Sequence, residues 1–245
     1  MREETIAGLR TVITGGPDRQ GGGEGPVVAL LHGFGANGDD LVGLWRALDV
    51  PREVRFAFPE APNALAGYGG ASYAWWMIDI SRWQRAVQGE VTPDEFYEDV
   101  PEGMSEARAG VQAWIAALRA RLGGGDAAPV PAERFVLGGF SQGATLAVDV
   151  ALRASEAFAG LCVLSGTLVC RSEWRARLPA AHGVPFFQSH GTRDPILPFF
   201  VGEALNALLS EGPFRGALLR FAGGHEIPQA VVQGLGGYLR DRLKR

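Results

Sequence analysis

A serine within a glycine-rich pentapeptide is the residue of this chain best placed for covalent chemistry. Ser141 is the centre of Gly139-Phe140-Ser141-Gln142-Gly143, after the strand-like run 134–137 and before the apolar-periodic run 144–152. A serine hydroxyl is a poor nucleophile, so it must be held in a sharp strand-to-helix turn within reach of a general base. Small residues two positions to either side permit that turn, and the following helix offers backbone N–H groups to an oxyanion. The pentapeptide therefore predicts a nucleophile elbow.

The general base for such a serine is sought among four histidines. Three have simpler interpretations, in a polar connection, at a strand end and before a glycine-rich turn: His182, His190 and His32. His225 lies in a glycine-rich loop after the last predicted strand, from which an imidazole can reach Ser141 across a sheet. A loop histidine is more often a solvent-exposed residue, but the position of His225 after Ser141 and Asp194 in the chain favours its role as the base.

The acid of the constellation is predicted from the same order. Asp194 directly follows a strand pattern, in a turn defined by Gly191 and Pro195. Its carboxylate could accept the second imidazole N–H of His225 and stabilise the imidazolium. The order Ser141, Asp194, His225 is the order of the α/β-hydrolase arrangement.

The elements that must position these residues alternate along the chain. Strand-like runs at 27–31, 54–58, 135–138, 161–164, 185–189 and 217–221 are separated by helical patterns at 40–48, 100–122, 144–152 and 199–209, and a last one follows at 227–243. This order predicts a mostly parallel sheet with helices on both faces, with ligands at the carboxyl ends of the strands. We expect one α/β domain over 1–245, beginning with a strand at 5–14 and a flexible, glycine-rich hairpin connection at 15–26.

Composition excludes several classes of partner. A net charge of −4, with no cluster of Lys and Arg, does not favour nucleic acid. No apolar run approaches the length of a membrane span and no basic, apolar leader opens the sequence, so we expect a cytoplasmic protein without stable membrane insertion. No metal-binding or phosphate-binding motif occurs, and neither metal nor cofactor is expected.

The segment 81–97 interrupts the alternation with polar and aromatic residues. Pro93 can open a short helix there, with Thr92 as its cap and Glu95 completing a capping box. On the catalytic side such an excursion would be a lid or a pocket wall; a surface loop anchored by its aromatic residues is the alternative.

With these motifs assembled, the chain resembles the phospholipase/carboxylesterase family of α/β-hydrolases, which includes acyl-protein thioesterases. Five blocks correspond in order: 31–41, 59–62, 139–144, 190–198 and 223–228. The resemblance implies Ser141 as nucleophile, Asp194 as acid and His225 as base. It also implies an oxyanion hole made of the backbone N–H groups of Phe34 and Gln142.

The segment 72–80 resembles the aromatic segment of that family but carries two adjacent tryptophans. The candidate substrate contacts in this chain are Trp75, Trp76, Met77 and Leu197. An aromatic wall could accept a bulky acyl or alcohol group, although core packing of one tryptophan is the simpler interpretation.

Together the motifs predict a serine carboxylesterase that acts through an acyl-enzyme on a small ester. An acyl thioesterase or a lysophospholipase with the same triad is the alternative, and a non-catalytic binding module is a further one. The apolar loop Pro198-Phe199-Phe200 could cover a substrate channel or form a homodimer contact.

Overall fold

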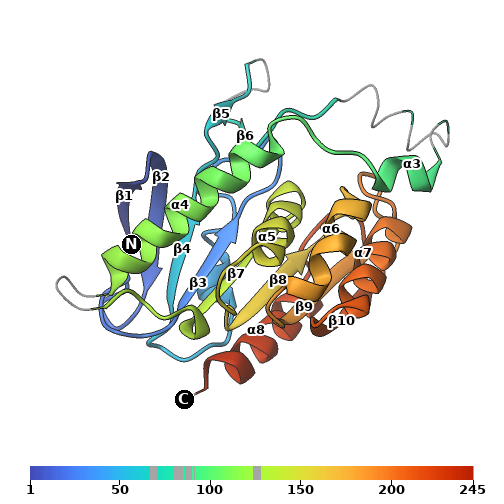
Figure 1. The fold of residues 1–245 in the computed structure, drawn as a ribbon. Helices are drawn as coiled ribbons and strands as arrows, with labels where there is room; N and C mark the ends of the chain where they lie inside the picture. The colour runs from blue at the N-terminus through green and yellow to red at the C-terminus, as the bar shows by residue number, and fades with distance from the viewer. Residues whose placement is uncertain (67–70, 80–84, 86–89, 91, 124–127, 245) are drawn as a thin grey trace.

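An eight-stranded sheet forms the centre of the molecule. The computed structural model describes residues 1–66, 71–79, 85, 90, 92–123 and 128–244. The strand order is β1-β2-β4-β3-β7-β8-β9-β10 (Figure 1). The strands are β1 Arg2–Ile6, β2 Leu9–Gly15, β3 Val27–Leu31, β4 Arg55–Pro59, β7 Phe135–Phe140, β8 Gly160–Leu164, β9 Pro185–Gly191 and β10 Arg215–Phe221. From β4 to β10 neighbouring strands are parallel, and β1 and β2 are antiparallel additions.

Helices cover both faces of this sheet, as predicted. One face carries α4 Met104–Leu122, α5 Gln142–Leu152, α6 Arg171–Arg177 and α7 Phe199–Glu211, and the other carries α1 Leu44–Ala47 and α8 Gln229–Leu243 (Figure 1). The sequence patterns did not indicate α6, and they predicted a longer helix at 40–48. Within the described residues, no helix is long and apolar enough to cross a membrane.

The N-terminal region departs from prediction in two ways. The predicted strand 5–14 is a hairpin, β1 and β2, whose turn is Ala7-Gly8 with φ angles of 46° and 84°. The connection 15–26 is not a hairpin, because β4 lies between the two strands that it joins. It folds instead around Asp18, whose Oδ1 accepts the N–H groups of Gln20 and Gly22 at 2.8 and 2.9 Å.

The antiparallel edge is tied to α4. Trp114 is fully buried on that helix, and its Nε1 donates to Thr11 Oγ1 on β2 at 2.9 Å. Arg55 of β4 is also buried and donates to the carbonyl oxygens of Gly25 and Leu122. Burial lowers the pKa of Arg55 to about 10. These contacts attach β2 and β4 to α4.

Much of the segment 81–97, to which the lid hypothesis applies, lies outside the described residues. Its described end forms the short helix α3 Pro93–Tyr97, with the predicted capping box between Thr92 and Glu95. Arg171 at the start of α6 binds Asp94 of α3 at 2.6 Å. β5 Asn63–Ala64 and β6 Tyr73–Ala74 form a two-stranded ribbon. It lies at the same end of the sheet as α3, at the top of Figure 1.

Candidate active site

Ser141 occupies the strained turn between β7 and α5. Its φ and ψ angles are 54° and −118°, a conformation that non-glycine residues rarely adopt, and the site is one where such strain is commonly stored. Its N–H donates to the carbonyl oxygen of Leu164 on the neighbouring strand at 2.8 Å. A Cβ at Gly139 or at Gly143 would lie 2.6 or 2.2 Å from the carbonyl oxygen of Leu31. Only glycine fits at both positions, as the pentapeptide predicted.

Asp194 lies at the end of β9 with its carboxylate fully buried. Oδ1 accepts the backbone N–H groups of Ile196 and Leu197, both at 2.8 Å. Oδ2 accepts Nδ1–H of His225 at 2.7 Å. Burial alone would raise the pKa of Asp194, but these hydrogen bonds outweigh it and hold the pKa below its usual value. The carboxylate is therefore ionised at neutral pH.

His225 follows β10 and lies between Asp194 and Phe140, the residue before Ser141. Its side chain is 15% exposed, and its ring lies against that of Phe140, with the two centroids 4.7 Å apart. Because Asp194 accepts Nδ1–H, the neutral ring has its lone pair on Nε2, the atom a general base needs. The hydrogen bond thus assigns the tautomer.

His190 is buried beside this pair. Its Nε2 donates to the carbonyl oxygen of Leu197 at 2.7 Å and lies 3.6 Å from Asp194 Oδ2. Burial is the main cause of its lowered pKa, so the ring is neutral. His190 therefore packs at the end of a strand, where the sequence placed it, and its contacts shape the turn around Asp194. His182 is exposed, as expected.

The loop after β3 lies against Ser141. A Cβ on Gly33 would be 3.3 Å from the Cβ of Ser141, which places the segment with Phe34 next to the serine. His32 supports this loop: its Nδ1 donates to Gly33 O at 2.8 Å and its Nε2 accepts Ala61 N–H at 3.0 Å. Burial lowers the pKa of His32, in keeping with this neutral ring.

Gln142 has a structural role that the sequence did not reveal. Its buried amide accepts the N–H of Trp75 at 3.0 Å and donates to the carbonyl oxygen of Trp76 at 2.8 Å. The Trp75 indole in turn donates to His32 O at 2.9 Å. The tryptophan segment is therefore held directly against the residue that follows Ser141.

The candidate substrate contacts fall in different places. Trp75 and Trp76 are buried, and Leu197 is buried and binds Asp194 through its backbone, whereas Met77 is 60% exposed. A cavity of about 490 Å³ is lined by both tryptophans and Met77, but not by Ser141, Asp194 or His225. No cluster of three or more His, Cys, Asp or Glu suited to a metal occurs among the residues that the structure describes.

Comparison with known proteins identifies the family. The model of the phospholipase/carboxylesterase family matches residues 19–242. The chain belongs to the phospholipase/carboxylesterase family. Acyl-protein thioesterase 1 of Neurospora crassa is 26% identical over 89% of this chain and 87% of its own length. A probable carboxylesterase of Oryza sativa is 26% identical over 89% and 77% of the respective chains.

Structural similarity agrees with this assignment. The crystal structure of esterase PE8 superposes with a TM-score of 0.75 at 26% identity, covering 96% of this chain and 99% of that one. The resemblance inferred from the motifs and the predicted α/β-hydrolase fold are both confirmed. As a member of the phospholipase/carboxylesterase family, the protein is an ester-bond hydrolase.

Proposed function

We propose that the protein is a serine carboxylesterase that uses Ser141, His225 and Asp194 through an acyl-enzyme intermediate. The observation that carries the proposal is the 2.7 Å hydrogen bond between His225 and the buried Asp194, beside the strained turn at Ser141. A base oriented by a carboxylate and a serine raised on a turn are the two requirements of acyl transfer by serine.

In the first step, Ser141 Oγ attacks the ester carbonyl and transfers its proton to Nε2 of His225. The backbone N–H groups of Phe34 and Gln142 stabilise the oxyanion that develops. The imidazolium, stabilised by Asp194, then protonates the departing alcohol, which leaves an acylated serine. Water attacks this ester in the second step with His225 again as base, and the acid product is released.

Hydrolysis of a thioester is the second candidate function. It is favoured by the relative named acyl-protein thioesterase 1, which covers 89% of this chain. The same nucleophile, base and oxyanion hole would serve, because a thiolate leaves more readily than an alkoxide.

The test is hydrolysis of p-nitrophenyl esters of increasing acyl length, with matched thioesters, by the wild type and by Ser141→Ala. We expect kcat to fall by about 10⁶-fold in the variant, as when a triad nucleophile is removed. The ratio of kcat/KM for ester and thioester of equal acyl length separates the two substrate classes. Hydrolysis that persists undiminished in a folded Ser141→Ala protein would contradict the mechanism.

A further inference from the structure

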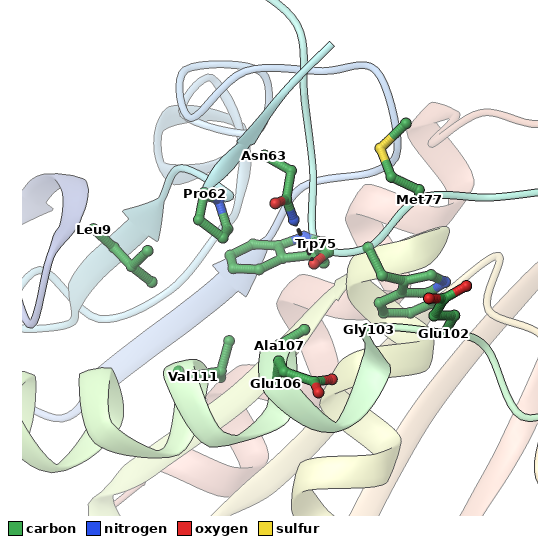
Figure 2. A pocket seen from close by; sticks show the side chains of 12 residues that line it. Leu9, Pro62, Asn63, Trp75, Met77, Glu102, Gly103, Glu106, Ala107 and Val111 are labelled. Carbon is green, nitrogen blue, oxygen red and sulfur yellow. Dashed lines mark hydrogen bonds between the residues drawn. The ribbon is translucent and has the colours of Figure 1, made fainter.

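A second binding site is suggested by the cavity beside α4, separate from the proposed catalytic residues. Its volume is about 490 Å³, within the range of about 300–1,000 Å³ usual for small-molecule sites. It lies between the start of α4, the end of the β1–β2 turn and the tryptophan segment (Figure 2). It is lined by Leu9, Pro62, Asn63, Trp75, Trp76, Met77, Glu102, Gly103, Glu106, Ala107, Gly110 and Val111.

The charge of the cavity wall has a single sign. Glu102 and Glu106 are exposed, and no positively charged residue belongs to the described lining. Figure 2 shows Glu106 on α4 below the Trp75 ring, and Glu102 further to the right. Ser105 Oγ donates to Glu106 at 3.2 Å, a contact that leaves the carboxylate charge in place. Electrostatic complementarity therefore calls for a cationic occupant.

Apart from Asn63, the remaining side chains of the wall are apolar, and the tryptophan segment is held in place. Trp75 and Trp76 are buried, at 1% and 6% exposed, and the small surface that they leave to the cavity is aromatic, which attracts cations as well as hydrocarbon. The side chain of Gln142 holds the segment by two hydrogen bonds, the Trp75 indole adds one to His32, and Asn63 Nδ2 donates to the carbonyl oxygens of Ala74 and Trp75. A wall held in this way loses little conformational freedom on binding.

We propose that this cavity binds an organic cation with an apolar body, such as a substituted ammonium ion. The cation would lie beside the carboxylates of Glu102 and Glu106, with its hydrocarbon part against the exposed side chain of Met77. Such a cation could be a separate molecule or the remote end of a charged ester. Gln142, the residue after Ser141, hydrogen-bonds the backbone of Trp75 and Trp76 and so connects the cavity wall to the turn of the proposed catalytic serine.

Binding is measured by ligand-observed NMR titration of the Ser141→Ala protein with benzyltrimethylammonium at low ionic strength. This readout needs no catalysis, so its result is independent of the proposed function. Benzyl alcohol and benzenesulfonate are the neutral and anionic probes. We expect saturable binding of the cation, and much weaker binding of the other two. Equal affinity for all three probes, or no saturable binding of the cation, would overturn the proposal.

Charge removal locates the site. The double substitution Glu102→Gln with Glu106→Gln should raise the Kd for the cation about tenfold, since each exposed pair contributes modestly. The matched control, Glu53→Gln with Glu133→Gln, removes two exposed carboxylates from outside the cavity and should leave the Kd unchanged. An unchanged Kd in the first variant would exclude this cavity as the site.

Filling the cavity gives an independent test. Gly110 lines it, and a Cβ there would meet no atom within 4 Å. Gly110→Leu should therefore fold and weaken binding of the cation, whereas Gly110→Ala should retain most of it. Equal affinities of the two variants would count against occupancy of the cavity.

Wild-type kinetics distinguish the two sources of the cation. A p-nitrophenyl ester with a trimethylammonium-terminated acyl chain is compared with its tert-butyl isostere. A lower KM for the charged ester, lost in the Glu102→Gln, Glu106→Gln variant, assigns the cation to the substrate. Equal KM values together with saturable binding of benzyltrimethylammonium assign it to a separate ligand.

Discussion

Replacing Asp194 with asparagine tests whether its carboxylate sets the tautomer of His225. In the structure Oδ1 accepts two backbone N–H groups at 2.8 Å and Oδ2 accepts Nδ1–H of His225 at 2.7 Å. Because both backbone partners are donors, the asparagine carbonyl oxygen must occupy the Oδ1 position. Its NH2 group then faces His225 and requires a lone pair on Nδ1. The proton moves to Nε2, the atom that accepts the proton of Ser141 in the proposed mechanism.

The expected loss is in kcat, by about 10³–10⁴-fold, which is the scale found when a triad imidazole is held in the wrong tautomer. This corresponds to about 4–5.5 kcal/mol of transition-state stabilisation. The two backbone hydrogen bonds survive, so the melting temperature should change little. The side-chain hydrogen bond, rather than the fold, is what the substitution removes.

The assay is steady-state hydrolysis of p-nitrophenyl butyrate near neutral pH, with circular dichroism melting of the same samples. Asp241→Asn is the matched control. Asp241 is an exposed carboxylate, and in the part of the chain that the structure describes it binds Lys244. It should keep wild-type kcat. The reasoning would be refuted by a folded Asp194→Asn protein whose kcat stays within about tenfold of wild type.

Four further predictions concern stability. Burial holds the pKa of His32 and of His190 below its usual value. As the pH falls through about 6.5, the two histidines take up protons in the unfolded chain but not in the folded one. They therefore leave the free energy of unfolding undiminished above that pH and lower it below. The free energy of unfolding, from urea titrations at several pH values, should fall below it by up to about 1.4 kcal/mol per pH unit per histidine; a flat profile would contradict this. Gly110→Ala adds a Cβ in open space on α4 and should raise the free energy of unfolding by about 0.5–1 kcal/mol. Gly202→Ala puts a Cβ 2.5 Å from His190 Nδ1 and should lower the free energy of unfolding by about 1–3 kcal/mol. If the Gly110→Ala and Gly202→Ala variants shifted the melting temperature in the same direction, this packing would be contradicted. Gln142→Ala leaves two buried backbone groups unpaired and should cost about 1–3 kcal/mol for each, measured by the same titrations; a change below about 1 kcal/mol would show that water replaces the amide.

The parts of the fold that sequence could predict are those with a local cause. The run at 27–31 is apolar throughout because a central parallel strand is buried on both faces, and β3 has these bounds. The capping box at Thr92 also depends only on neighbours in sequence, and it is present. By contrast, the hairpin turn Ala7-Gly8 was missed because alanine gives no signal for a positive φ.

Contacts between distant segments were beyond the same reasoning. Nothing near β2 indicates that β4, 40 residues further along, pairs with it in place of β3. The role of Gln142 depends on partners 66 and 67 residues away in sequence. A buried glutamine at the start of a helix carries no mark of which backbone groups it will bind.

The sequence by itself determined the types and the order of the chemical groups: a serine between glycines, an aspartate after a strand and a histidine after the last strand. It also determined the alternation of strands and helices, because side-chain periodicity is a local property. Only the tertiary structure decided that His225 binds Asp194 and that the tryptophans line a cavity apart from the serine. Both depend on which strands lie side by side, and strand order results from pairing across the whole chain, where packing and hydrogen bonding outweigh local preference.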